Sequence, residues 1–225
     1  MSDKMPDFIA SRISHRYGRK SILTDCSIEA SKGDCIGIAG RNGCGKSTFL
    51  SILAGTVKPE GGSITCFGQD LLANRRAFGR LIGYVPQVSP LIGELTALDN
   101  LRLLTGRNYS GNEPVLQNLE IPNLLHTKVS SLSGGMQRRL AIASALAENP
   151  PVLVMDEPTS ALDLYHKSRI YDNLKAYRNL GGIVIMATHD LEEMAFCSTL
   201  YLISGGTART ESPESAAEQI KTAYI

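Results

Sequence analysis

The sequence predicts an α/β fold with a mainly parallel β-sheet, a small antiparallel β layer and an inserted helical subdomain. Three short apolar runs predict the parallel sheet, because they lack the polar–apolar alternation of a strand that has one face in water. Helical segments separate these runs, as in a chain that crosses over between parallel strands. The runs are Cys35–Ala39, Val152–Met155 and Ile183–Ala187.

The antiparallel layer is expected from three β-like segments near the amino terminus, at Phe8–Ile13, Ile22–Ile28 and Ser63–Phe67. From about residue 91 to 148 strand signals disappear, and leucine-rich helical segments dominate. Thr96 and Asp99 have the spacing of a capping box that opens a helix in this region. A length of 225 residues suits one domain. We therefore expect a single domain over residues 1–225, with the helical subdomain at about 91–148 inserted in the α/β core.

Composition and charge exclude several protein classes. Hydrophobic residues make up 43% of the chain and charged residues 20%, which is the balance of a globular protein. The formal net charge of +1 argues against a strongly basic nucleic-acid-binding protein, so we expect no nucleic-acid partner. Five cysteines without a CxxC pair favour reduced thiols over a disulfide framework or a zinc site. No apolar run approaches the roughly 18 residues of a membrane span, so a membrane role requires a partner.

A glycine-rich loop follows the first apolar strand and matches the pattern G-x-x-x-x-G-K-[ST] over Gly40–Ser47. Its glycines let successive backbone N–H groups point at phosphate oxygens, and the helix expected from Thr48 adds its positive dipole end. The loop therefore predicts a P-loop NTPase core that binds ATP and Mg²⁺. We expect the nucleotide-binding residues here to be Gly40, Asn42, Gly43, Cys44, Gly45, Lys46, Ser47 and Thr48.

Two acidic residues, Asp156 and Glu157, follow the second apolar strand. An aspartate at a strand end can hold Mg²⁺ through water, and a glutamate one residue later can act as general base on the attacking water. Asp-Glu-Pro is also good turn chemistry, so the same letters could mark an ordinary acidic turn. The glycine-rich loop upstream favours the metal and base roles.

The segment Leu132–Gln137 resembles the signature motif of ABC-type ATPases. Other elements of that family follow in its order: an adenine-stacking aromatic at Tyr17, the Q-loop glutamine at Gln87, the D-loop at Ser160–Asp163 and the switch histidine at His189. The resemblance extends from about residue 17 to residue 206. Taken alone, Tyr17, Gln87 and His189 could each be an ordinary surface residue. Their order and their neighbours favour functional roles.

The resemblance implies a role for each phosphate- and metal-binding residue. Lys46, with the backbone of Gly43 and Gly45, binds the β and γ phosphates. Ser47 and Gln87 ligate Mg²⁺, and Asp156 is the third metal-site residue because it orients a water of the metal. The catalytic residues are then Glu157, His189, Lys46 and Gln87. Glu157 polarises the nucleophilic water, while His189 contacts the γ phosphate and fixes the geometry of Glu157.

The signature motif has a physical meaning of its own. Ser133 is a good N-cap, and the helix expected from Arg138 to Ala147 gives a second anion-binding helix start. A plain capped helix would have the same sequence. The family's use of the motif is a head-to-tail dimer, in which Ser133, Gly134 and Gly135 complete the ATP site of the other subunit and Asp163 links the two sites. The partner could be a second copy or a related chain, and the absence of any degenerate motif favours a homodimer.

Two positions depart from the common pattern. Met136 stands between the paired glycines and Gln137, although the serine and glycines that contact phosphate are intact. Cys44 occupies a variable loop position at the start of a helix, which is expected to lower the pKa of its thiol. We hypothesise that alkylation of this thiol inhibits the ATPase and that bound ATP protects it.

The family implies transport through a membrane-spanning permease subunit, which must be a separate chain. Its coupling helix would enter a groove bordered by the helical subdomain and the Gln87 loop. The protein would then be cytoplasmic, peripheral to the inner face of the cell membrane. The short tail after Gly206 and the Gln-Arg-Arg after the signature favour export. A soluble ABC ATPase, such as that of iron–sulfur cluster assembly, is the alternative, and the signature speaks against a small-molecule kinase.

Overall fold

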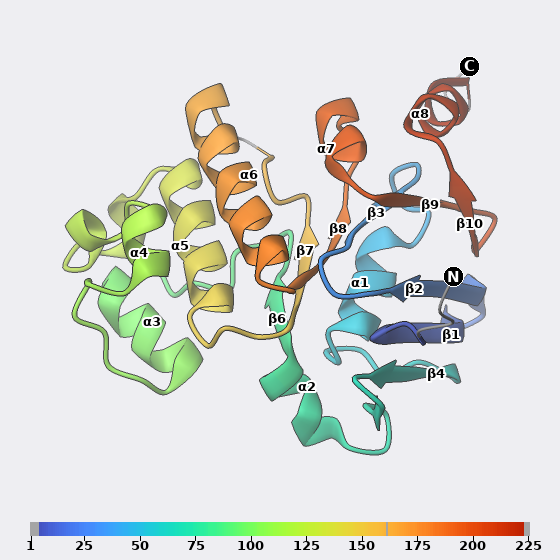
Figure 1. The fold of residues 1–225 in the computed structure, drawn as a ribbon, viewed down its shortest axis with the longest axis horizontal. Coiled ribbons are helices and arrows are strands. Elements are labelled where there is room, and N and C mark those ends of the chain that lie inside the picture. Colours follow the sequence, from blue (N-terminus) through green and yellow to red (C-terminus); the bar gives the residue numbers. More distant parts are fainter. Residues whose placement is uncertain (1–4, 161, 223–225) are drawn as a thin grey trace.

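The computed structural model describes residues 5–160 and 162–222 and contains two β-sheets with helices packed around them (Figure 1). The larger sheet has six strands in the order β10-β9-β3-β8-β7-β6. Five of these strands run parallel, and only the edge strand β10 is antiparallel to its neighbour. The strands are β3 (Cys35–Ala39), β6 (Ile82–Val85), β7 (Val152–Asp156), β8 (Ile183–Ala187), β9 (Thr199–Ser204) and β10 (Thr207–Glu211).

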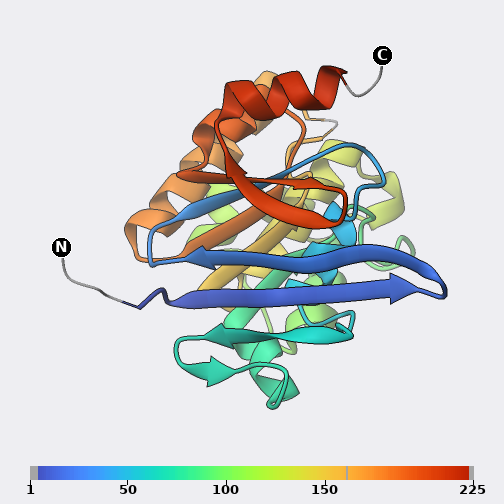
Figure 2. The same cartoon turned by 90° about the vertical axis from the view of Figure 1, so that its right-hand side faces the viewer.

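The smaller sheet is antiparallel, with the order β2-β1-β4-β5. Figure 2 shows β1 and β2 as a long hairpin near the amino terminus. These strands are longer than the sequence patterns predict, because their pairing continues through several register shifts to the turn between Tyr17 and Lys20. The strands are β1 (Phe8–Tyr17), β2 (Lys20–Ala30), β4 (Gly61–Cys66) and β5 (Gln69–Asp70). The predicted antiparallel layer is thus present, and with the parallel sheet it confirms the predicted α/β fold class.

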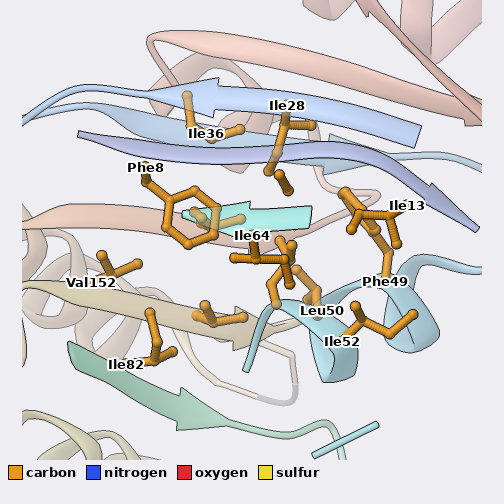
Figure 3. Close-up of a cluster of buried hydrophobic side chains, with 14 of the residues drawn as sticks. Phe8, Ile13, Ile28, Ile36, Phe49, Leu50, Ile52, Ile64, Ile82 and Val152 are labelled. Carbon is orange, nitrogen blue, oxygen red and sulfur yellow. The ribbon is translucent and has the colours of Figure 1, made fainter. Parts of the chain in front are cut away.

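The central strands are apolar throughout because each of their faces packs on a different core. Val152 and Val154 of β7 belong to a cluster that includes α1 (Lys46–Leu53) and the antiparallel sheet. Figure 3 shows α1 residues of this cluster close to side chains of both sheets. Leu153 and Met155 point the opposite way, into a second cluster formed with α3 (Ala97–Thr105), α5 (Gly134–Leu146) and α6 (Leu164–Asn179). Burial on both faces accounts for the missing alternation.

The segment between β6 and β7 adds no strand to either sheet within the described residues. It forms α3 (Ala97–Thr105), α4 (Pro114–Asn118), two short 3₁₀ turns and α5 (Gly134–Leu146), which lie at the end of the molecule away from β1 and β2 (Figure 1). Thr96 caps α3 as predicted, because its hydroxyl accepts a bond of 3.1 Å from the Asp99 N–H. The Asp99 carboxylate accepts from the Thr96 hydroxyl.

The remaining helices are α2 (Arg75–Leu81), α6 (Leu164–Asn179), α7 (Leu191–Phe196) and α8 (Pro213–Thr222). Helix α1 begins at Lys46 rather than at Thr48, so it starts inside the glycine-rich loop. Helix α5 begins at Gly134 rather than at Arg138, since Ser133 already caps it. Among the residues that the structure describes, no helix is long and apolar enough to span a bilayer.

Candidate functional site

A pocket of about 350 Å³ opens where the parallel strands β3, β6, β7 and β8 end. This position is where α/β sheets usually bind ligands. The glycine-rich loop forms one side, and residues that follow β6, β7 and β8 form the other. The lining residues are Ile22, Asn42, Gly43, Gly45, Lys46, Ser47, Thr48, Gln87, Glu157 and His189.

The backbone of the glycine-rich loop needs its glycines. Gly45 has a φ of 110°, and an added Cβ would lie 2.9 Å from Cγ2 of Ile22. Lys46 follows at the first position of α1, with its side chain buried. Its ammonium donates to the carbonyls of Gly40 at 2.8 Å and Arg41 at 3.1 Å. The loop therefore holds a positive charge and a helix start at the pocket, which is the chemistry that a polyphosphate requires.

Asp156 is the last residue of β7, and its side chain is almost completely buried beside Ser47. Burial raises the pKa of the Asp156 carboxyl, whereas the hydrogen bond from Ser47 opposes that rise. A hydroxyl and a carboxylate side by side at a phosphate loop suit Mg²⁺, which prefers oxygen ligands and keeps several waters. These two residues therefore fit a magnesium ion bound together with phosphate.

Glu157 stands at the centre of a cluster of polar side chains from three strand ends. Its Oε1 lies 3.1 Å from Nδ1 of His189, and its Oε2 accepts a bond of 3.2 Å from Nε2 of Gln87. The Glu157 side chain is only 15% exposed, so the pocket wall shields it from most solvent. The structure thus brings together Lys46, Ser47, Gln87, Glu157 and His189, as the motifs lead one to expect.

Other expected site residues lie outside the lining of this pocket. Tyr17, at the end of β1, is 54% exposed, and its ring meets that of His15 edge to face at 4.8 Å. Ser133 caps α5, with its hydroxyl accepting from the Met136 N–H at 3.3 Å, and Gly134 and Gly135 begin that helix. Asp163 caps α6 by accepting from the His166 N–H at 2.9 Å. This bond is the main reason why the pKa of Asp163 lies below its usual value.

Cys44 differs from its expectation. Its side chain lines a second hollow of about 330 Å³, which Arg41, Ile203 and Ile220 also line. Burial raises the pKa of the Cys44 thiol, and the nearby charge of Lys46 opposes this only in part. The prediction of a lowered pKa is therefore wrong, because desolvation of the thiolate outweighs the helix start.

The sequence motifs gave no role to Arg138, which the structure places against the same site. This buried residue of α5 donates hydrogen bonds to the carbonyls of Pro86, Asp156, Glu157 and Pro158. The Pro86 carbonyl lies 52 residues before Arg138 in the chain, and the other three lie 18 to 20 residues after it. Only its place directly after Gln137 of the signature segment marks Arg138 in the sequence.

Comparison with known proteins identifies the family. The ABC transporter family model matches residues 23–160. The "Nod factor export ATP-binding protein I" of Rhizobium etli is 36% identical over 209 residues, or 89% of this chain and 66% of that protein. Its namesake from Bradyrhizobium diazoefficiens is 35% identical over 96% of this chain and 72% of that protein. The chain thus spans about two thirds of the length of these relatives.

Solved structures agree with the sequence comparisons. A dimeric ATP-binding cassette in a post-hydrolysis state, bound to ADP and Pi, is 28% identical and superposes with a TM-score of 0.80 over 92% of this chain and 98% of that chain. A bacterial Atm1-family ABC exporter with ATP bound is 26% identical, with a TM-score of 0.83 over 100% of this chain and 43% of that chain. The chain belongs to the ABC transporter family, among its ATP-binding ABC ATPases.

Proposed function

We propose that this protein hydrolyses MgATP and thereby powers export through a separate membrane-spanning partner. The observation that carries the proposal is the meeting of Gln87, Glu157 and His189 across the pocket from the phosphate loop. A base, an amide and an imidazole at that position can order and deprotonate a water beside a bound phosphate. The word "export" in the names of the rhizobial relatives supports the direction.

Each residue has a chemical task in this proposal. Lys46 exchanges its bonds to the loop carbonyls for bonds to the β and γ phosphates. Ser47 and Gln87 would ligate Mg²⁺, and Asp156 would orient one of its waters. The bound ion would supply charge neutralisation at the phosphates. Glu157 takes the proton of the attacking water, and the neighbouring His189 orients Glu157 and contacts the γ phosphate.

The proposed active form is a homodimer. Ser133, Gly134 and Gly135 form a capped helix start that lies outside the pocket lining of their own chain. A helix start with free N–H groups attracts phosphate. A second copy arranged head to tail would place these groups on the nucleotide, and Asp163 at the start of α6 would stand between the two sites. The dimeric state of the ADP-bound cassette supports this arrangement.

The membrane partner is proposed to dock in a groove of about 360 Å³ beside the Gln87 loop. Its lining includes Tyr84 and Pro86 as well as Leu104 of α3 and Ala145 of α5. Leu104 is 44% exposed, so an apolar helix of the partner could cover it. Residues 1–225 would then act as one ATPase domain at the cytoplasmic face of the membrane, with the helical subdomain at about 91–148 contacting the partner.

Hydrolysis is tested with Glu157→Gln. Removal of a general base typically lowers a rate by about 10²–10⁴-fold, so we expect such a fall in kcat while MgATP still binds. The measurements are phosphate release and nucleotide binding by calorimetry. Glu29→Gln, which makes the same change at an exposed site on β2, is the control and should keep the wild-type rate. An unchanged kcat in Glu157→Gln would remove Glu157 from the mechanism.

The partner is tested by co-expression with a multispan membrane protein encoded beside this gene. Wild-type protein should co-purify with it from membranes, and Leu104→Arg should reduce the yield of the complex at least about tenfold, because a charge in an apolar contact costs several kcal/mol. Leu180→Arg changes a leucine that is 88% exposed and lines a different hollow, so it should co-purify normally. Recovery of the wild-type protein only in a soluble complex would favour a soluble ABC ATPase.

A further inference from the structure

The side chain of Arg138 joins the signature helix to the site that contains Glu157. Arg138 lies more than one turn after Ser133, on the same helix α5. Its NH1 donates to the Pro86 carbonyl at 2.6 Å, its Nε to the Pro158 carbonyl at 3.1 Å and its NH2 to the Glu157 carbonyl at 2.8 Å. NH2 also donates to the Asp156 carbonyl. One guanidinium therefore connects α5 to the segments that follow β6 and β7.

A buried guanidinium that bonds to neutral carbonyls is costly to the fold. Arg138 is only 8% exposed, and within the described part of the chain no carboxylate forms a salt bridge with it. Burial lowers the pKa of the Arg138 guanidinium, although the charges of Asp156 and Glu193 oppose this. A buried charged group is weak evidence for stability. In some proteins such a group instead specifies one conformation.

The backbone that Arg138 holds is strained at the proposed base. Glu157 has a φ of 49°, a left-handed conformation that non-glycine residues rarely adopt. Such strain persists only where the surrounding structure enforces it. Arg138 donates hydrogen bonds to the backbone carbonyl of Asp156, directly before the strained residue, and to the backbone carbonyl of Glu157 itself. It also fixes Pro86, directly before Gln87, whose amide contacts the Glu157 carboxylate.

We propose that Arg138 is a positioning residue that ties the hydrolytic geometry at Glu157 and Gln87 to the placement of α5. This inference rests on the proposed function. Because Arg138 is buried and its planar guanidinium is held by four carbonyls at once, a shift of α5 would change the bonds to Pro86 and Glu157. In the proposed dimer, the nucleotide held by a second copy would contact Ser133–Gly135 of this chain. That contact would therefore favour one arrangement of Glu157, the proposed general base, in this chain.

The next residue of α5 provides a matched control. Arg139 is also buried, at 5% exposed, and it also donates to a backbone carbonyl, that of Leu119 at 3.1 Å. Its other partner is the carboxylate of Glu120 at 2.8 Å. These contacts stay next to α4, away from the pocket. Loss of the guanidinium at Arg139 thus tests what a buried arginine of α5 contributes to the fold alone.

The first experiment compares Arg138→Lys with Arg139→Lys. Lysine keeps the charge but loses the fork that holds several carbonyls at once. Misplacement of a catalytic group by about 1 Å can cost 10²-fold, so we expect Arg138→Lys to lower kcat by about 10²-fold. Its MgATP dissociation constant should stay within about threefold of the wild-type value, since the loss falls on the transition state. Arg139→Lys should keep the wild-type kcat.

The second experiment asks whether Arg138 acts through Glu157. If it does, adding Arg138→Lys to Glu157→Gln should barely change the residual rate, because the positioned base is already absent. A further fall of about 10²-fold in the double variant would show independent effects and overturn the proposal. A wild-type kcat in Arg138→Lys would overturn it as well.

Folding is checked by thermal unfolding of each variant, with Arg138→Gln as a second, uncharged substitution. Failure of both Arg138 variants to fold, while Arg139→Lys folds, would assign Arg138 to the fold and refute its positioning role. The two proposals can fail separately. Absence of ATP hydrolysis by the wild-type protein would refute the proposed function, whereas the comparison among variants tests the role of Arg138.

Discussion

At the scale of single residues, Asp156 occupies a proposed metal-site position whose burial disfavours the charged form of its carboxyl. Burial raises the pKa of its carboxyl in the folded protein above the unfolded value. The contribution of this group to stability is therefore full below the unfolded pKa and is lost as pH rises through the folded pKa. At neutral pH the ionised carboxylate then works against folding, as is common for groups that serve function.

We accordingly expect Asp156→Asn to raise the Tm of the nucleotide-free protein at pH 7 while it lowers MgATP hydrolysis at least about 10²-fold. The gain in Tm should shrink as pH falls below the raised pKa, where the wild-type carboxyl is already protonated. Thermal unfolding between pH 4 and pH 8 and a phosphate-release assay measure both effects. A lower Tm for Asp156→Asn at pH 7 would show that Ser47 needs the charged form.

Cys44 gives a prediction about pH that follows from its raised pKa. Only the thiolate reacts with alkylating reagents, so the raised pKa leaves little reactive form at neutral pH. We expect slow labelling by iodoacetamide at pH 7 and a labelling rate that increases up to pH 9. Peptide mass spectrometry gives the extent of labelling, with Cys44→Ala as the control. Rapid labelling that does not depend on pH would contradict this environment, and inhibition of Cys44→Ala by the reagent would place the sensitive thiol elsewhere.

The sequence predicts the residues of the site better than it predicts the contacts that keep them in position. Lys46, Ser47 and Asp156 occur in short motifs whose spacing carries the chemistry, so they can be recognised without coordinates. Arg138 cannot, because its partners at Pro86 and Asp156–Pro158 come close only through tertiary packing. The left-handed backbone of Glu157 is likewise enforced by its surroundings and has no signal in its residue type.

At the scale of elements, two helix caps have the same geometry and different proposed roles. Thr96 and Ser133 each accept from a backbone N–H in the first turn, of α3 and α5 respectively. Replacement of either by alanine should cost about 1 kcal/mol of stability. Only Ser133→Ala is expected to weaken ATP-dependent dimer formation, because only that cap would face a nucleotide in the proposed dimer. Denaturant unfolding and sedimentation measure the two effects, and equal loss of dimer in both variants would reduce Ser133 to a structural cap.

The elements that sequence patterns reveal are those with strong burial signals. Strands β3, β7 and β8 are buried at every position, so their apolar runs are unmistakable. Helix α6 buries only Ile170, Leu174 and Tyr177 over its length, which leaves a weak pattern in a polar segment. Helix α5 starts at two glycines, which are poor helix formers, and its true start becomes clear only with the Ser133 cap in place.

At the scale of the whole molecule, the two anion-binding helix starts serve different nucleotides in the proposed mechanism. The start of α1 lines the pocket of this chain, whereas Ser133, Gly134 and Gly135 at the start of α5 do not. The pocket is therefore half of a proposed composite site. Arg138 would connect the position of Glu157 in this chain's pocket to the start of α5, which contributes to the partner's ATP site. ATP binding, dimer formation and hydrolysis should consequently be coupled.

The most direct test of this account is the mass in solution of the Glu157→Gln variant, measured by light scattering with and without MgATP. We predict the monomer mass of 24.3 kDa without nucleotide and twice that mass with saturating MgATP. Adding Ser133→Arg should return the nucleotide-bound protein to the monomer mass, because the larger cation blocks the start of α5. A Glu157→Gln protein that binds MgATP and stays at the monomer mass would contradict the composite site, as would a dimer that survives Ser133→Arg.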